Sequence, residues 1–520
     1  MSVPIFSPVF RHAEAAPDKV AAASPRAALS YGGLAQAAAL LIRAMPAPDR
    51  RSERAGIPGG NRIVAVSLRN GIGFFPVLLA ATAPATVMAL IPPSLPERAV
   101  RRLLDRLRPD CLFIDRDRAC GAFGDGVPIF AVDSETGVNA SLDRMDTVDT
   151  MVPRTCDSGP KPQERGRDAD PDSPFLIGLT SGSSGDPKAF YRSRESWRRS
   201  LEQHENTFGL TARDCVLAPG PLSHGLTLYA AAEALYAGAG FRFLERFDAA
   251  AALKMLAAEP VTRLTLVPAM LHDILDRAGT ARFSSVTMIV SAGAKLPALL
   301  RERARAAFPA AKILEYYGAS ELSFVTLADG SAPPASVGRA FPGVHVSIRD
   351  ATGGREVPDR EIGTLFVDSP LVSNGYCFDD AGTGFTRTGR WAGVGDRAWR
   401  DAEGFFYLAG RQGEGINSGG NSFYPEEVEA VLAEHRLVDA VCVLGLDDAR
   451  LSQVAVAVIE SRGAPALADL QACCAERLPR YKTPRRFFVL VGMPRTESGK
   501  IDRAALAGMI AAGSSDLKEL

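Results

Sequence analysis

The chain of 520 residues has little of several features that would point to a particular class of function. Its 59 lysines and arginines are almost cancelled by 60 aspartates and glutamates, and the net charge is −1. Proteins that bind nucleic-acid backbones usually carry a clear basic excess, so nucleic acid is not an expected partner. Hydrophobic residues make up 46% and charged residues 23% of the chain, which is typical of a folded globular protein.

Long apolar runs are also missing. The most apolar stretch, residues 77–91, is shorter than the roughly 20 residues that a membrane-spanning helix needs, and Pro84 interrupts it. The first twenty residues lack the basic and then apolar pattern of a signal peptide. We therefore expect no integral membrane segment and a cytoplasmic location.

Cysteine and histidine are scarce in the patterns that bind metals. None of the eight cysteines forms a CxxC pair, which favours reduced thiols over a disulfide framework or a structural zinc site. His204 and Glu205 begin like the HExxH motif of zinc proteases, but Phe208 stands where the second histidine would be. A zinc protease is therefore excluded.

The pattern along the chain indicates a layered α/β protein of more than one unit. Short apolar runs alternate with helical patterns in the first third, and the expected strands are 63–68, 87–91, 111–114 and 129–132. A glycine-rich stretch at 410–420 indicates a hinge or an exposed loop. The residues after it have the helical and strand-like patterns of a small α+β domain.

One loop has the composition of a phosphate-binding site. The apolar run 175–179 predicts a buried strand, and the loop that follows is rich in hydroxyls and glycine and ends in a lysine. Hydroxyls and backbone N–H groups donate to phosphate oxygens, and lysine offsets their charge. The spacing GxxGxPK differs from a Walker A loop, so the loop alone leaves a serine-rich turn equally open. The residues concerned are Thr180, Ser181, Gly182, Ser183, Ser184, Gly185 and Lys188.

This loop resembles the signature of the AMP-forming acyl-adenylate superfamily, which includes acyl-CoA synthetases, nonribosomal adenylation domains and luciferases. Further segments resemble motifs of that superfamily and occur in the same order, over nearly the whole chain. They are 315–321 (EYYGASE), 363–376 (GTLFVDSPLVSNGY), 391–396 (WAGVGD), 407–411 (YLAGR), 416–429 (INSGGNSFYPEEVE) and 494–503 (PRTESGKIDR). The chain is most similar to a bacterial acyl-CoA ligase.

The resemblance implies a fold of two parts. Residues 1–413 are expected to form a large N-terminal AMP-binding domain with several subdomains, in which layered sheets and helices are joined by a small β subdomain. Residues 414–520 are expected to form a small, mobile C-terminal α+β domain. Glu414 is the candidate hinge residue.

The same resemblance assigns roles to individual residues. The implied catalytic residues are Lys188, Ser320, Glu321 and Lys500, with Glu321 holding Mg²⁺ and Lys500 reaching the reacting carboxylate and the α-phosphate. The loop 180–188 would hold the outer phosphates of ATP. The residues expected at the adenine and ribose are Gly293, Ala294, Tyr317, Gly318, Asp396 and Arg411.

The acyl pocket is expected around His224, Tyr229, Ser323 and Phe324. Amino-acid-activating relatives place an aspartate near the position of His224, and none is present here. A fatty or aryl acid without an α-amine is therefore favoured. His224 is as well explained by packing in the core as by contact with substrate.

The implied function is ATP-dependent activation of a small carboxylic acid to acyl-AMP, followed by transfer to the thiol of CoA. ATP, Mg²⁺ and CoA are the expected cofactors. One alternative is an adenylation enzyme that loads the phosphopantetheine of a carrier protein. A second is a non-catalytic acyl- or nucleotide-binding protein on the same fold. Val394, Asn417 and Gly413 depart from the usual motifs, but no core catalytic group is lost.

Overall fold

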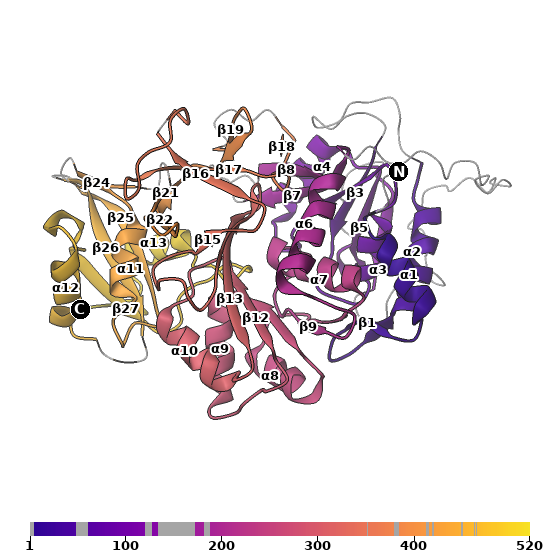
Figure 1. The fold of residues 1–520 in the computed structure, drawn as a ribbon, viewed down its shortest axis with the longest axis horizontal. Coiled ribbons are helices and arrows are strands. Elements are labelled where there is room, and N and C mark those ends of the chain that lie inside the picture. The colour runs from indigo at the N-terminus through magenta and orange to yellow at the C-terminus, as the bar shows by residue number, and fades with distance from the viewer. Residues whose placement is uncertain are drawn as a thin grey trace.

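In the computed structural model the described residues form four β-sheets, which confirms the α/β class, with a large N-terminal part and a smaller C-terminal part (Figure 1). The N-terminal two thirds of the chain build the right and centre of the view, and the C-terminal part lies at the left. The structure describes residues 5–47, 61–119, 127–133, 172–180, 188–350, 352–378, 384–411, 415–418, 421–448, 451–461, 463 and 465–520.

The first sheet has seven strands in the order β18-β8-β7-β4-β3-β5-β6. Their bounds are β3 (Arg62–Ser67), β4 (Thr86–Leu90), β5 (Cys111–Asp115), β6 (Ile129–Val132), β7 (Pro174–Thr180), β8 (Lys188–Ser193) and β18 (Gly375–Tyr376). Strands β4, β3, β5 and β6 are parallel neighbours, and β4 and β5 are buried along their whole length. Burial on both faces is typical of parallel strands between helices. The strands expected from the sequence are all present.

The second sheet has nine strands in the order β15-β14-β13-β12-β11-β9-β10-β1-β2. Their bounds are β1 (Val20–Ala23), β2 (Ala28–Ser30), β9 (Cys215–Leu217), β10 (Gly240–Arg242), β11 (Arg263–Leu266), β12 (Met288–Ala292), β13 (Lys312–Ala319), β14 (Ser323–Ala328) and β15 (Arg339–Ala340). The neighbours β9, β11, β12 and β13 run parallel, so their carboxyl ends meet at one edge.

Two helices join these sheets. Helix α6 (Arg194–Phe208) contacts β7 and β8 of the first sheet, α7 (Gly225–Ala237) contacts β9, β10 and β11 of the second, and the two helices contact each other. The largest buried hydrophobic cluster draws side chains from both sheets. The other α-helices among the described residues of the N-terminal part are α1 (Ser7–Ala15), α2 (Tyr31–Ala44), α3 (Phe74–Ala80), α4 (Glu97–Leu107), α8 (Ala249–Ala258), α9 (Pro268–Ala278) and α10 (Ala298–Ala307).

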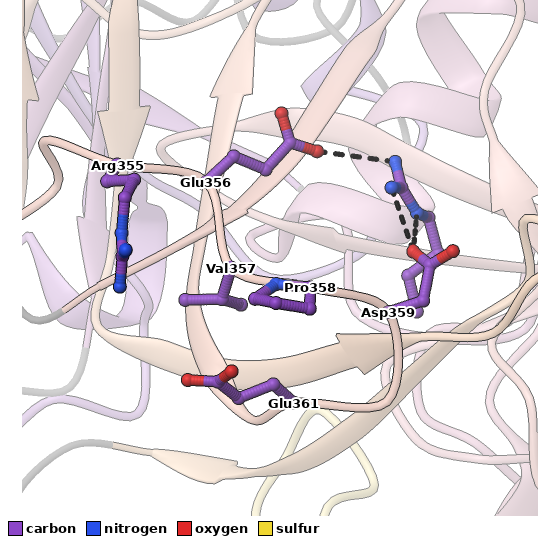
Figure 2. A pocket seen from close by; sticks show the side chains of 7 residues that line it. Arg355, Glu356, Val357, Pro358, Asp359 and Glu361 are labelled. Atoms are coloured by element: carbon purple, nitrogen blue, oxygen red, sulfur yellow. Dashed lines mark hydrogen bonds and ion pairs between the residues drawn. The ribbon is translucent and has the colours of Figure 1, made fainter.

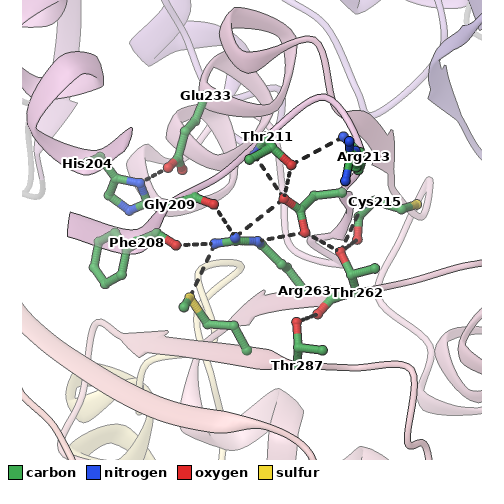
Figure 3. A network of polar contacts seen from close by, with 12 residues as sticks. His204, Phe208, Gly209, Thr211, Arg213, Cys215, Glu233, Thr262, Arg263 and Thr287 are labelled. Carbon is green, nitrogen blue, oxygen red and sulfur yellow. Dashed lines mark hydrogen bonds and ion pairs between the residues drawn. The ribbon is translucent and has the colours of Figure 1, made fainter. Parts of the chain in front are cut away.

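A buried polar network fixes α6 against α7 and β11 (Figure 3). His204 on α6 contacts the carboxylate of Glu233 on α7. Arg263 on β11 donates to the backbone oxygen of Phe208 at 2.8 Å, and its Nε lies 3.2 Å from Asp214. The histidine of the incomplete HExxH motif therefore joins two helices.

The third sheet is the small β subdomain that the resemblance implied. Its order is β19-β20-β17-β21-β22, and β16 pairs with β17. The bounds are β16 (His345–Arg349), β17 (Gly363–Asp368), β19 (Thr386–Thr388), β20 (Trp391–Gly393), β21 (Asp396–Arg400) and β22 (Phe406–Arg411).

The C-terminal part has its own sheet and its own hydrophobic clusters. The sheet order is β24-β23-β26-β27-β28, with β25 beside β26. The bounds are β23 (Ile416–Ser418), β24 (Asn421–Phe423), β25 (Ala440–Asp448), β26 (Ser452–Glu460), β27 (Arg486–Leu490), β28 (Lys518–Glu519), α11 (Pro425–Leu432), α12 (Leu467–Arg477) and α13 (Arg503–Ala511). The proposed hinge residue, Glu414, lies outside the described residues. No helix in the described ranges is long and apolar enough to cross a membrane.

Candidate active site

The site is built at the edge where parallel strands of the nine-stranded sheet end. In the pairing of β12 with β13, Ala292 stands opposite Tyr316. The next residues, Gly293 and Tyr317, therefore emerge side by side at the carboxyl end of the sheet. Ligand sites of α/β sheets commonly form at such an edge. Ser320 and Glu321 follow β13 directly, in the turn that leads into β14.

Three residues assigned to adenine and ribose are in direct contact. The Tyr317 hydroxyl donates to Oδ2 of Asp396, and Arg411 Nε donates to Oδ1 of the same carboxylate at 2.8 Å. Asp396 and Arg411 face each other across the β21–β22 pair, which fixes their distance through the backbone. Burial, and then the nearby Asp396 carboxylate, raise the pKa of Tyr317 well above its usual range. The phenol therefore stays protonated and acts as a donor.

Glu321 is held by a residue for which the sequence suggested no role. Its side chain is buried, and the Tyr376 hydroxyl donates to Oε1 at 2.8 Å. Burial and the nearby Glu321 raise the pKa of Tyr376 above its usual range, while a hydrogen bond with Thr180 acts in the opposite direction. Tyr376 therefore links the end of β7 to the carboxylate proposed as a metal ligand. The GY pair was visible as part of a motif, but nothing in the sequence indicated this partner.

This carboxylate suits Mg²⁺ in its chemistry. Magnesium prefers oxygen ligands and is bound in phosphotransfer sites by one or two carboxylates together with substrate phosphates. The hydrogen bond from Tyr376 engages Oε1 alone. Glu321 at Oε2 can therefore accept a cation without the loss of that bond. No cluster of three or more His, Cys, Asp or Glu side chains suited to a metal occurs in the described part of the chain.

Lys500 lies on a tight turn of the C-terminal part that rests on the N-terminal sheet. Gly499 has a φ of +79°, and a Cβ there would lie 2.6 Å from Cγ2 of Val267, so glycine permits this close approach. The Cε of Lys500 would lie 3.9 Å from a Cβ at Gly293. The sequence predicted that Lys500 reaches the site, and the structure brings it to the edge of β12.

Lys500 is influenced by charged residues from both the expected ribose site and the expected metal site. Part of its side chain stays open to solvent, yet its position among protein atoms lowers its pKa below the ordinary value. Arg411 acts in the same direction, while Asp396 and Glu321 oppose it. The Lys500 ammonium group therefore interacts electrostatically with both Asp396, on the ribose side, and Glu321, on the expected metal side.

A second contact holds the Lys500 turn in place. Ser94, in the loop after β4, donates to Oε2 of Glu497 at 2.7 Å. The same turn also acts on His224. Burial lowers the pKa of His224, the Glu497 carboxylate raises it, and the Lys500 ammonium lowers it further. The turn 496–500 is therefore bound to both sheets of the N-terminal part. Ser94 and Glu497 are 403 positions apart in the chain, and no local motif signals their contact.

The residues expected in the acyl pocket lie at the start of α7 and of β14. His224 directly precedes α7 and is partly buried, and Tyr229 follows on that helix. The rings of Tyr229 and Phe324 are 5.1 Å apart, and Ser323 has a φ of +63°. These positions are compatible with a pocket wall, which stays a prediction.

Several expected site residues fall on parts of the chain that are not described. They are Ser181, Gly182, Ser183, Ser184 and Gly185. The two ends of their loop are described, and Thr180 and Lys188 stand opposite each other in the β7–β8 pair. Gly318 and Ala294 lie at the strand ends described above, next to Tyr317 and Gly293.

A hollow elsewhere on the surface contains none of the predicted residues. It is lined by the segment 355–361 and Arg400 (Figure 2). Arg400 pairs with Asp359 at 2.9 Å and with Glu356 at 3.4 Å, so its charge is already compensated. We assign no function to this hollow.

The geometry agrees with comparisons to known proteins. Residues 9–377 match the model of the AMP-binding enzyme family, and residues 427–500 match that of the AMP-binding enzyme C-terminal domain. The chain belongs to the AMP-binding enzyme family. This confirms the superfamily that the motifs indicated.

Named relatives are acyl-CoA ligases. The chain is 38% identical over 338 residues to an uncharacterised acyl-CoA ligase, YhfT, of Bacillus subtilis, covering 64% of this chain and 68% of that protein. It is 32% identical over 379 residues to an indoleacetate–CoA ligase of Aromatoleum aromaticum, covering 70% and 72%. The solved O-succinylbenzoate CoA synthetase (MenE) of Bacillus subtilis, in complex with AMP, has the same fold. Its TM-score is 0.77 at 23% identity, with 97% of this chain and 98% of that chain covered. The predicted class of acid–thiol ligase is confirmed.

Lys500→Ala should abolish adenylation while sparing nucleotide binding. Its charge is useful mainly when the two anions approach each other, so its loss affects the transition state more than the bound ground state. We expect the adenylation rate to fall at least about 100-fold and the Kd for ATP to change less than about threefold. Single-turnover kinetics and calorimetry measure the two quantities. Lys518→Ala, an exposed lysine in the same part, is the control. An unchanged rate in Lys500→Ala would refute the assignment.

Ser94→Ala and Glu497→Ala should each slow adenylation because both remove the contact that holds the Lys500 turn. A hydrogen bond of roughly 1 kcal/mol corresponds to a loss of about three- to tenfold in single-turnover rate, with little change in KM for ATP. The double variant should be no slower than either single variant, since both lose the same interaction. Glu519→Ala, at an exposed glutamate, is a matched control. Losses that multiply in the double variant would show that the two residues act independently.

Proposed function

We propose that the protein joins a carboxylic acid without an α-amino group to the AMP portion of ATP and then transfers the acyl group to the thiol of CoA. The observation that carries this proposal is the position of the Lys500 turn, which comes from another part of the chain and packs against Val267 and Gly293 at the carboxyl end of the sheet. The family and the named ligases give independent support.

The first step needs positive charge, because a carboxylate must approach a triphosphate. The acid's oxygen would attack the α-phosphorus, and pyrophosphate would leave with the electron pair of the broken P–O bond. Lys500 would offset the charge of both anions at the point of contact. Mg²⁺, held by Glu321, would neutralise part of the phosphate charge. Asp396, oriented by Tyr317 and Arg411, would accept hydrogen bonds from the ribose hydroxyls.

In the second step the sulfur of CoA would attack the acyl carbon, and AMP would leave. We propose that residues 414–520 act as the mobile part between these steps, with Glu414 at the hinge. Separate hydrophobic clusters on the C-terminal side support this division. A cytoplasmic location also stays a proposal, and the described cysteines, which are all free thiols, agree with it.

The alternatives differ in the acceptor or in the chemistry. A carrier-protein phosphopantetheine presents the same thiol group as CoA, so the site does not distinguish between the two. A non-catalytic binding protein would have no need for Lys500, Glu321 and Asp396 together. We therefore favour the ligase.

Acid-dependent exchange of labelled pyrophosphate into ATP tests the first step directly. We expect exchange with fatty or aryl acids at a rate at least about tenfold above that with any amino acid, since the segment 221–225 around His224 contains no aspartate to bind an α-amine. Release of AMP should then require CoA. Exchange only with amino acids would overturn the pocket argument, and exchange with no acid would overturn the enzymatic function. Thioester formation only with a carrier protein would select that alternative.

A further inference from the structure

Arg192 is a buried cation to which no carboxylate is bound in the part of the chain that the structure describes. It lies on β8, is 5% exposed, and directs Nε and Nη2 to the Ser196 hydroxyl at 3.0 and 2.8 Å. Nη2 also donates to the Ser196 backbone oxygen at 3.2 Å. Burial lowers the pKa of Arg192 to about 10, so the side chain is still charged at neutral pH.

Other buried arginines nearby have clear partners. Arg194 donates to the backbone oxygens of Thr82, Ala83 and Thr86, just beyond the negative end of α3, at 3.0, 2.8 and 2.6 Å. Arg263 pairs with the Asp214 carboxylate. Arg192 instead lies against the first turn of α6, at the positive end of that helix.

An uncompensated charge in this position is costly. Burial of an ion without a partner costs several kcal/mol, and the helix end adds to that cost. Proteins retain groups of this kind mainly where function needs them. The position of Arg192 is therefore better explained by an anion that binds to it than by the stability of the fold.

The groups around Arg192 also lack acceptors. Its guanidinium lies over the Trp197 ring at 5.6 Å, and the indole Nε1–H is buried without a hydrogen-bond partner among the described residues. Ser196 donates onward to the oxygen of Leu371 at 3.0 Å, two residues before Ser373. The Ser373 hydroxyl is likewise buried without a partner in the described chain. Guanidinium and indole N–H groups can only donate, so they suit an oxygen acceptor.

This cluster adjoins the wall of the expected acyl pocket. The Trp197 ring is 5.5 Å from that of Tyr229, which is 5.1 Å from Phe324. The Ser373 N–H donates to the Glu321 backbone oxygen at 2.7 Å. Along α7, Tyr229 is five residues from His224, a rise of about 7.5 Å away from the end near Lys500. Arg192 and Trp197 therefore border the expected pocket on its Tyr229 side, the side remote from Lys500.

We propose that Arg192, together with Trp197 Nε1–H, binds a second carboxylate at the far end of the substrate acid. The preferred substrate is then a dicarboxylic acid, one carboxylate of which is activated while the other pairs with Arg192. This proposal rests on the proposed ligase function, and it narrows the class of fatty or aryl acid expected from the sequence. Charge-assisted pairing with guanidinium favours a carboxylate over a neutral carbonyl.

The test compares dicarboxylic acids of graded length with their monomethyl esters in ATP–pyrophosphate exchange. An ester keeps the reacting carboxylate and the length of the acid, and it lacks only the distal charge. We expect the best dicarboxylic acid to exceed its monoester at least tenfold in kcat/KM in the wild-type protein. Equal values would overturn the inference while the ligase function stands. Exchange with no acid at all would overturn both.

Arg192→Met tests the residue itself. We expect the preference for the dicarboxylic acid to disappear while exchange with the monoester stays within about twofold of wild type, and the unfolding midpoint should not fall, because an apolar replacement removes an uncompensated buried charge. Arg199→Met, at an exposed arginine on the adjoining helix α6, should leave the preference unchanged. A lower unfolding midpoint with equal losses for all acids would show a structural role and overturn the assignment. Should the variant fail to fold, the wild-type comparison still decides the inference.

Discussion

The site depends on one contact, the turn that brings Lys500 of the C-terminal part onto the end of β12. The approach is close because Gly499 and Gly293 have no side chains where Val267 and Lys500 pass. Every charge in the proposed mechanism is arranged around this point. Asp396 and Glu321 both raise the pKa of Lys500, and Arg411, which donates to Asp396, lowers it. Without the turn, the N-terminal part would hold its carboxylates with one cation fewer.

The residues that orient this set come from distant parts of the chain. Tyr376 reaches Glu321 from β18, at the edge of the seven-stranded sheet, whereas Glu321 follows a strand of the nine-stranded sheet. Ser94 reaches Glu497 from the loop after β4. Both contacts tie the seven-stranded sheet to the site. The helix pair α6–α7 also joins these two sheets. The geometry of the site is therefore set by how the sheets pack together.

Much of the fold could be predicted from the sequence, because strands buried on both faces are continuous apolar runs. The runs 63–68 and 111–114 correspond to β3 and β5, and 175–179 forms the centre of β7. Tyr317, Asp396 and Arg411 were expected to act together from their motifs, and they are in contact. The Ser94–Glu497 contact could not be predicted, since it depends on how two parts of the chain pack. The environment of Arg192 could not be predicted either, because it depends on tertiary packing that leaves this buried guanidinium without a carboxylate among the described residues.

Transfer of an oxygen atom from the acid to AMP tests the central claim most directly. With an acid labelled with ¹⁸O in its carboxylate, attack on the α-phosphorus places one labelled oxygen between the acyl group and AMP. The thiol then breaks the bond on the acyl side, and that oxygen leaves with AMP. The account predicts one ¹⁸O in AMP and none in pyrophosphate, measured by mass spectrometry of the products with ATP and CoA. Unlabelled AMP, or label in inorganic phosphate alongside ADP, would contradict it.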